Sequence, residues 1–297
     1  MLQESDIIPY HLSHPPGERA IVLAPHPDDE TLGCGGTIRL LLKAKIPVKV
    51  IFLTSGDKAD PSNPKSYTTN NHEHYHPPLI PPVEGGKTEE RLLSREARLW
   101  PTRKGSSTIP SPLAGEGKGE GGFNITEYAL LREKEAEKAM KILGVSDYEF
   151  LRFPDRELNL YYKSALDRLL EIIGTYMPDT IYSPSMIELN PDHRTTAVLS
   201  MEIHRINKGK IVFYEITIPL RPNILVDITS VYMMKKRAIK KYKSQLKLLD
   251  YLRHITALNT IRSLTVNVAG YVEAFWCVDN PLNSEDVIKW LSYQART

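Results

Sequence analysis

The feature that constrains the fold most is a short apolar segment that runs directly into a cluster of polar side chains. Residues 21–30 read IVLAPHPDDE, and a helical pattern follows at 37–45 (TIRLLLKAK). An apolar run of this length that stops at a proline predicts a buried strand. In open α/β sheets, the carboxyl ends of the strands are where functional sites form. We therefore expect His26, Asp28 and Asp29 at such an edge, where they can contribute to a divalent metal site.

A second polar cluster follows another short strand. Residues 180–183 predict that strand, and NPDHRTTA at 190–197 leads into a helical pattern. His193 from this segment, with a histidine and an aspartate from the first cluster, makes a set of three metal ligands. Three protein ligands and one open position are typical of a catalytic zinc ion, whereas a closed structural site has four, usually with cysteines. The chain has only Cys34 and Cys277, which excludes a closed cysteine site.

The two motifs resemble those of the PIG-L/LmbE-like family of zinc-dependent N-deacetylases. The family motif A-H-P-D-D-E is matched by APHPDDE, with one extra proline before the histidine, and the family motif H-P-D-H is matched by NPDH. Further matches include FPDREL at 153–158, YKSQ at 242–245 and VEAF at 272–275. The resemblance covers the chain except for about residues 58–125.

The resemblance implies roles for single residues. It implies His26, Asp29 and His193 as metal ligands, with zinc as the default ion and Fe2+ or Co2+ as ions that suit the same donors. It implies Asp28 as the general base that takes a proton from the attacking water and can return it to the leaving amine. Taken alone, the DDE triplet would be as typical of an acidic first turn of a helix.

One position departs from the family motif. Asn190 stands where the family has a histidine that stabilises the oxyanion and is thought to protonate the leaving group. An asparagine amide can donate a hydrogen bond to an oxyanion, but it has no titratable proton. We therefore expect Asn190 to keep the first role and Asp28 to carry both proton transfers, with slower turnover or lost activity as further outcomes.

Two further residues are candidates for substrate binding. In the family, an arginine at the position of Arg132 faces the pocket, whereas the alternative here is a surface arginine paired with Glu135. Asp155 follows a predicted strand at 148–153 and looks like an acceptor for a sugar hydroxyl, whereas the alternative is a turn-forming aspartate. The helix that Arg132 opens has a predicted buried stripe at helical spacing, made of Ala136, Ala139, Met140 and Leu143.

Strand and helix patterns alternate along the chain, which predicts a Rossmann-like α/β fold with a doubly wound, mostly parallel sheet and helices on both faces. The predicted strands are 21–24, 48–53, 148–153, 180–183 and 211–217. A single domain over 1–297 is expected, because no second self-contained periodic region is present. It is interrupted at about 58–125 by a segment rich in Pro, Gly, Ser, Lys and Glu, which predicts a largely disordered insertion able to cover the pocket.

Composition limits the remaining function classes. A net charge of +2 gives no general attraction for nucleic acid. No apolar stretch is long enough to span a bilayer, and residues 1–20 lack the features of a signal peptide. With only two cysteines, a reducing cytoplasm is the expected location. Residues 233–254 predict one basic helix that packs Ile239, Tyr242, Leu246 and Leu249 inward, and contact with a membrane surface is the less favoured interpretation.

These inferences predict a cytoplasmic, zinc-dependent amidohydrolase. It would remove an acetyl group from an N-acetylglucosamine-type sugar or its conjugate, giving acetate and a free amine. A catalytically silent sugar-binding module that retains the metal site stays open as an alternative, as does an amidase for a non-sugar N-acyl substrate. The sequence does not indicate the oligomeric state.

Overall fold

The computed structural model describes residues 11–60, 125–266, 268, 270–279 and 289. The chain divides into two compact units, one formed by Met1–Ser66 with Gly117–Thr297 and the other by Tyr67–Glu116. The second unit lies outside the described residues, as does most of the predicted insertion at 58–125. The prediction of a largely disordered insertion that is able to cover the pocket therefore stays a prediction, and so does the single-domain organisation.

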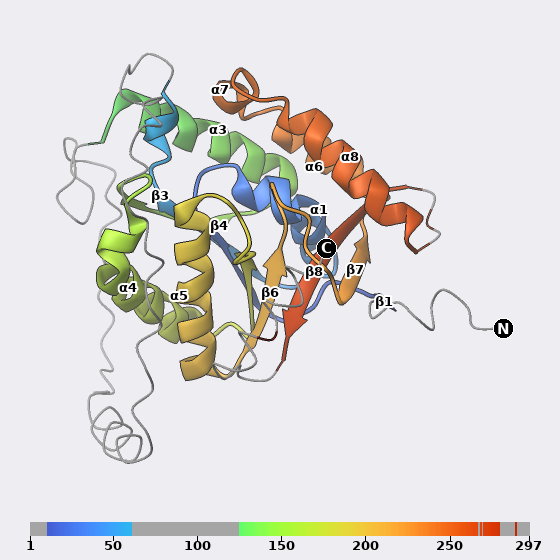
Figure 1. Ribbon diagram of the computed structural model, residues 1–297, viewed down its shortest axis with the longest axis horizontal. Helices are drawn as coiled ribbons and strands as arrows, with labels where there is room; N and C mark the ends of the chain where they lie inside the picture. Colours follow the sequence, from blue (N-terminus) through green and yellow to red (C-terminus); the bar gives the residue numbers. More distant parts are fainter. Residues whose placement is uncertain (1–10, 61–124, 267, 269, 280–288, 290–297) are drawn as a thin grey trace. The chain divides into compact units, whose positions relative to one another are not determined.

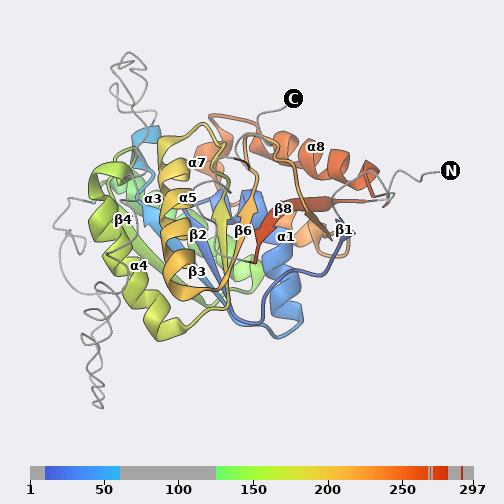
Figure 2. The same ribbon diagram turned by 60° about the horizontal axis from the view of Figure 1, so that its bottom comes forward.

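In the described part of the chain, eight strands form one mixed sheet in the order β1-β7-β8-β6-β5-β2-β3-β4 (Figures 1 and 2). The β8 strand runs antiparallel to β6 and β7, and the other neighbouring pairs are parallel. The predicted mostly parallel α/β sheet is thus confirmed. The strands are β1 His11–Leu12, β2 Ala20–Ala24, β3 Val48–Thr54, β4 Asp147–Phe153, β5 Thr180–Pro184, β6 Lys210–Tyr214, β7 Ile224–Asp227 and β8 Val272–Val278.

Helices cover both faces of the sheet, with α4 and α5 on one face and α1, α3, α6 and α8 on the other (Figures 1 and 2). Two short 3-10 helices, η2 Asp57–Ala59 and η3 Leu158–Tyr161, follow strands β3 and β4. The α-helices are α1 Asp29–Lys43, α3 Glu127–Leu143, α4 Tyr162–Tyr176, α5 Pro191–Asn207, α6 Tyr232–Ile239, α7 Lys243–Leu246 and α8 Tyr251–Leu264.

The central strand β2 supplies both hydrophobic layers, because successive side chains of a strand point to opposite faces. Val22 packs in the cluster that contains Ile38 of α1, whereas Leu23 packs in the cluster that contains Leu169 of α4. All five residues of β2 are buried, as expected for a parallel strand covered on both sides. The predicted stripe of α3 is confirmed, since none of its members is exposed: Ala136, Ala139, Met140 and Leu143.

Helix α1 begins earlier than the predicted segment 37–45 and is interrupted at Cys34, where φ is −138° and ψ is 23°. The Glu273 carboxylate accepts hydrogen bonds from the backbone N–H groups of Gly36 and Thr37, each at 2.8 Å. A carboxylate at this place caps a fresh helical segment, since the first N–H groups of a helix lack intrahelical partners. The predicted helix therefore corresponds to the second part of α1.

The prediction of one continuous helix over 233–254 is wrong, because the segment forms α6, α7 and the start of α8. Two buried acids interrupt it. Glu135 accepts hydrogen bonds from the Ser244 backbone N–H at 3.0 Å and from the Ser244 hydroxyl at 2.6 Å. Glu30 accepts one from the Tyr242 hydroxyl. These contacts hold the chain after α6 in a turn that a continuous helix would not allow.

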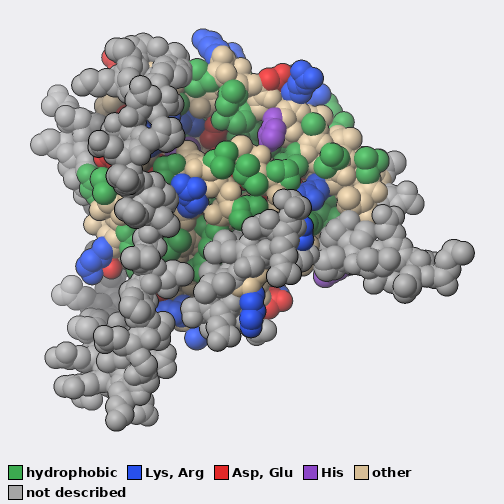
Figure 3. Space-filling view, in the orientation of Figure 1, with side chains coloured by type: hydrophobic (Ala, Val, Ile, Leu, Met, Phe, Trp, Pro, Cys, Tyr) green, Lys and Arg blue, Asp and Glu red, His purple; other side chains and the backbone are tan. Residues whose placement is uncertain are grey.

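The side-chain arrangement of this segment also differs from the prediction. Ile239 and Tyr242 are buried as predicted, but Leu249 is 60% exposed because it lies in the turn before α8. Lys235 is fully buried rather than solvated. Over α6, α7 and α8, the lysine and arginine side chains stand apart from one another between hydrophobic and other side chains (Figure 3).

Among the helices of the described chain, none combines the length and the apolar character that crossing a bilayer requires.

Candidate metal centre

The three predicted metal ligands come from the carboxyl ends of two neighbouring strands. β2 and β5 are adjacent and parallel, so the segments that follow them leave the sheet at the same edge. His26 lies in the turn after β2, and Asp29 is the first residue of α1. His193 lies in the first turn of α5, which follows β5. The topology therefore brings together residues that are far apart in the sequence.

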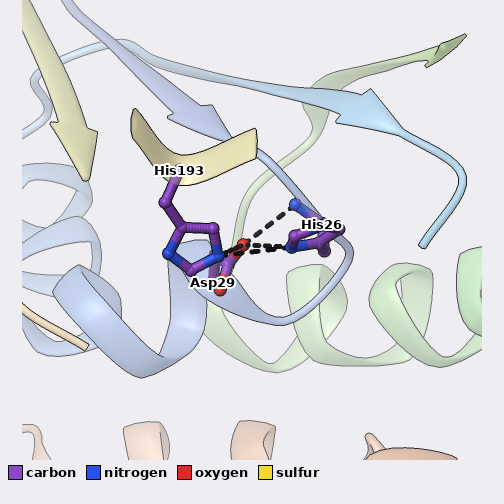
Figure 4. A group of neighbouring side chains, drawn as sticks. All are labelled: His26, Asp29 and His193. Carbon is purple, nitrogen blue, oxygen red and sulfur yellow. Dashed lines mark hydrogen bonds and ion pairs between the residues drawn. The ribbon is translucent and has the colours of Figure 1, made fainter. Parts of the chain in front are cut away.

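The donor atoms of these residues converge on one point (Figure 4). Asp29 Oδ2 lies 3.1 Å from His26 Nδ1 and 3.1 Å from His193 Nε2. The two imidazole nitrogens are 3.3 Å apart. All three residues are buried. Two imidazoles and one carboxylate facing each other at these separations suit a divalent metal ion, so the residues present fit the ion that the sequence implies.

The electrostatics of the cluster keep Asp29 ionised, as a metal ligand must be. Burial by itself would raise the pKa of Asp29, but the charge and hydrogen bonds of His193 and His26 hold that pKa well below its usual range.

The other ring nitrogen of His26 faces a second pair of carboxylates. His26 Nε2 lies 3.1 Å from Asp155 Oδ1 and 3.3 Å from Asp192 Oδ2. Asp155 is 4% exposed and Asp192 is fully buried. Burial by itself would lower the pKa of His26, but these two carboxylates together with Asp29 raise it well above its ordinary value.

Asp28 has an unusual backbone conformation beside the predicted metal ligands. Its φ is +143° and its ψ is −29°, a combination that L-residues rarely adopt. The Asp28 backbone N–H donates to Glu30 Oε2 at 3.1 Å, which holds this turn in place. Burial raises the pKa of Asp28 to about 7, although the charge of Arg132 opposes the rise. A strained, buried carboxyl group with this pKa is a candidate for proton transfer.

Arg132 is part of the same centre. Its Nη2 lies 3.1 Å from Asp28 Oδ1 and donates to the Pro27 carbonyl at 2.6 Å, and its Nη1 donates to the Gly56 carbonyl at 2.6 Å. Arg132 is 3% exposed, so the alternative of a surface arginine paired with Glu135 is wrong. Arg132 therefore fixes the position of the Asp28 carboxylate.

Asn190 is the N-cap residue of α5. Its side-chain oxygen accepts the backbone N–H of Asp192 at 2.8 Å. Asparagine is among the preferred N-cap residues because it satisfies one of the unpaired N–H groups at a helix start. This role uses the acceptor of the amide and leaves Nδ2 as a donor.

Three residues of the centre received no role from the sequence. Asp192 belongs to the NPDH motif, Glu30 belongs to the acidic triplet, and Tyr242 belongs to the YKSQ match and to the predicted inward face of the basic helix. The Tyr242 hydroxyl donates to Glu30 Oε1 across 212 residues of sequence. The signal for Glu30 was present in the DDE triplet, but no sequence pattern paired it with Tyr242.

The sequence matches a known protein family and a characterised relative. The family model described as PIG-L, GlcNAc-PI de-N-acetylase, matches residues 21–97 and 104–204, which is more than half of the chain. The chain belongs to the PIG-L family. This PIG-L protein is 24% identical over 249 residues to the diacetylchitobiose deacetylase of Thermococcus kodakarensis, a match that covers 77% of this chain and 70% of the relative.

Solved structures share the fold of this PIG-L protein. The N,N'-diacetylchitobiose deacetylase from Pyrococcus horikoshii, complexed with its inhibitor MPG, has a TM-score of 0.59 at 21% identity, covering 93% of this chain and 90% of that one. GalB, the 4-carboxy-2-hydroxymuconate hydratase of Pseudomonas putida KT2440, has a TM-score of 0.56 at 20% identity, covering 90% and 98%. At these identities the likeness establishes the fold alone, and the activity must be argued from the site.

Proposed function

We propose that this PIG-L protein hydrolyses the N-acetyl amide of an N-acetylglucosamine-type sugar or of its conjugate, giving acetate and a free amine. The observation that carries the proposal is the buried cluster of His26, Asp29 and His193 with the Asp28 carboxyl group directly beside it. Membership of the GlcNAc-PI de-N-acetylase family and similarity to a diacetylchitobiose deacetylase support an amino-sugar amide as the substrate.

His26, Asp29 and His193 would hold the metal ion, with zinc as the first candidate and Fe2+ or Co2+ as alternatives. When bound, such an ion supplies a Lewis acid for the amide carbonyl and lowers the pKa of water toward neutrality.

Asp28 performs the proton transfers. One of its carboxylate oxygens, Oδ1, faces Arg132 at 3.1 Å, which leaves the other to accept a proton from the attacking water. Because its pKa of about 7 lies near neutral pH, Asp28 can accept this proton and then return it to the leaving amine. The Nδ2 donor of Asn190 is the proposed hydrogen-bond partner of the oxyanion.

Direct substrate contacts of Arg132 and Asp155 stay predictions. In this structure the Arg132 guanidinium is engaged by Asp28 and two backbone carbonyls. Both Asp155 oxygens also have partners, since Oδ1 faces His26 and Oδ2 accepts the Lys58 backbone N–H at 2.8 Å. The cytoplasmic location and the weak interpretation of 233–254 as a membrane contact likewise stay predictions.

The asparagine at position 190 supports a second candidate function. Asn190 stands where the family motif has a titratable histidine, and its side chain caps α5. The protein can therefore instead be a sugar-binding module that retains the metal site. An amidase for a non-sugar N-acyl compound would use the same residues, and the hydratase with this fold shows that the fold admits other reactions.

The test is acetate release from a panel of N-acetylglucosaminides, using metal-stripped protein reconstituted with zinc beside Asp28→Asn. We expect release that requires the metal and falls by about 10²-fold or more in the variant, which keeps the metal. Sugar binding without release would favour the binding module. Release from non-sugar N-acyl amides alone would favour the other amidase.

A further inference from the structure

We propose that Asp155 and Asp192 act together as positioning residues that hold the proton of His26 on Nε2, so that Nδ1 presents its lone pair to the metal ion. This inference rests on the metal site of the proposed function. It assigns to Asp155 a role different from the predicted sugar contact, and it gives Asp192 a role that no sequence motif indicated.

The geometry of the His26 ring carries the proposal. Nδ1 faces Asp29 Oδ2 at 3.1 Å, and Nε2 faces Asp155 Oδ1 at 3.1 Å and Asp192 Oδ2 at 3.3 Å. A metal-bound imidazole can keep a proton on only one nitrogen, and that nitrogen is fixed by the hydrogen bond it donates. Two carboxylates at Nε2 therefore select the tautomer in which Nδ1 is free to bind the ion.

Asp192 is itself held rigidly. Its Oδ2 accepts the backbone N–H of Arg156 at 2.6 Å, and its Oδ1 accepts that of Leu158 at 3.1 Å. These bonds tie the first turn of α5 to Arg156, which lies between β4 and η3, and to the first residue of η3. Since Asp192 is fully buried, its carboxylate cannot turn away to solvent.

Asp155 is fixed from a third segment, because its Oδ2 accepts the Lys58 backbone N–H at 2.8 Å. Asp155, in the turn after β4, and Asp192, in α5, thus reach the same imidazole nitrogen from two different segments, and each is anchored by backbone amides. Side chains locked in this way define the orientation of a ligand more strictly than solvent-exposed ones.

A second cation among His26, Asp155 and Asp192 is the competing interpretation, since their ligand atoms also lie within 4.8 Å of one another. Hydrogen bonds favour the positioning role. Three of the four carboxylate oxygens of Asp155 and Asp192 accept a backbone N–H, and a cation at this place would be close to those donors.

The test measures zinc affinity by competition with a chromophoric chelator, on the full chain, for the wild type, Asp155→Asn, Asp192→Asn and the double variant. We expect each single variant to lose about 10- to 100-fold in zinc affinity. We expect the double variant to lose less than the product of the two, because both carboxylates act on one proton. Asp179→Asn is the matched control, since Asp179 also accepts backbone N–H groups, from Glu18 and Arg19, but lies directly before β5, at the end of the strand opposite the centre.

A second measurement separates positioning from general damage to the fold. Imidazole NMR of the zinc-loaded wild type should show a His26 Nε2–H proton shifted downfield by its hydrogen bonds to the two carboxylates. This downfield shift should shrink in Asp155→Asn and Asp192→Asn while circular dichroism stays unchanged.

Three outcomes would overturn the inference. The first is unchanged zinc affinity in both single variants. The second is a higher KM in Asp155→Asn with unchanged zinc affinity, because that result indicates a contact between Asp155 and the sugar. Two zinc equivalents per chain, one of them lost in Asp155→Asn, would establish the second cation site instead. Failure of the proposed function would give a different result: the variants would still lose zinc affinity as expected, but the wild type would release acetate from no substrate.

Discussion

Lys235 Nζ lies 2.7 Å from Glu273 Oε1, and neither side chain is exposed to solvent. The lysine also donates to Asn259 Oδ1 at 3.0 Å, and the glutamate accepts the backbone N–H groups of Gly36 and Thr37. This ion pair therefore joins α6, α8 and β8 to the second part of α1. The first part of α1 carries Asp29, which we propose as a metal ligand, so the pair supports the helix on which the candidate centre is built.

Removing one partner of this pair should be strongly destabilising. We expect Lys235→Met to lower the free energy of unfolding by about 3–5 kcal/mol, because the Glu273 carboxylate would stay buried without its counter-charge. Urea denaturation followed by circular dichroism measures the change. Lys240→Met is the matched control, since Lys240 is exposed at the end of the same helix, and we expect it to cost less than about 0.5 kcal/mol. Equal losses in the two variants would contradict the argument.

The parts of the fold that the sequence predicts are those with a strong local signal. Each of the five predicted strands is present, and the largest difference is in 211–217, where β6 already ends at Tyr214. Strands β1, β7 and β8 were missed. β1 has two residues, and the antiparallel insertion of β8 between β6 and β7 depends on long-range pairing rather than on a local pattern.

The candidate site also has parts that a local sequence pattern predicts and parts that it does not. The convergence of His26, Asp29 and His193 follows from polar motifs at the ends of neighbouring parallel strands, which a sequence displays directly. Asp192, which faces His26 Nε2 from α5, is 166 residues away in the sequence, and no local pattern joins the two residues. The break of 233–254 was missed for a similar reason, because the acids that cause it, Glu30 and Glu135, belong to other helices.

The link between Arg132 and Gly56 gives a second prediction. Gly56 has φ +62°, and a Cβ atom there would lie 2.1 Å from Arg132 Nη1. We expect Gly56→Ala to lower kcat/KM at least about tenfold, because displacing Arg132 moves the Asp28 carboxylate, and a small misplacement of a catalytic group is costly. The measurement is acetate release under zinc saturation.

Gly144→Ala is the control for this experiment. Gly144 also has a positive φ, +87°, at the end of α3, so alanine there carries a similar backbone cost of about 1–2 kcal/mol. Its neighbour is Arg39, which is not part of the centre. We expect Gly144→Ala to lower stability and leave kcat/KM unchanged. If the two variants lost activity to the same degree, the effect would be one of stability rather than of Arg132.

Metal binding should stabilise the folded protein. At a zinc concentration one hundred times Kd, we expect the free energy of unfolding to rise by about 2.7 kcal/mol, with a corresponding rise in Tm. The rise should be absent in His193→Ala. His204→Ala serves as the control, because His204 is a buried histidine of the same helix that contacts the Gly209 carbonyl instead of the centre. A zinc-dependent rise in Tm in His193→Ala would show that the ion binds elsewhere.

The last prediction concerns Asn190, whose side chain caps α5 by accepting the Asp192 backbone N–H at 2.8 Å. We expect Asn190→Ala to lower the free energy of unfolding by about 1 kcal/mol through loss of this cap, and Asn190→Asp to retain it. Asn190→His should raise kcat on the order of tenfold or more, because an imidazole supplies a second proton donor for the leaving amine. Its pH–rate profile should also gain an ionisation absent from the wild type. A binding module would show no gain in acetate release from Asn190→His, even with zinc and sugar both bound.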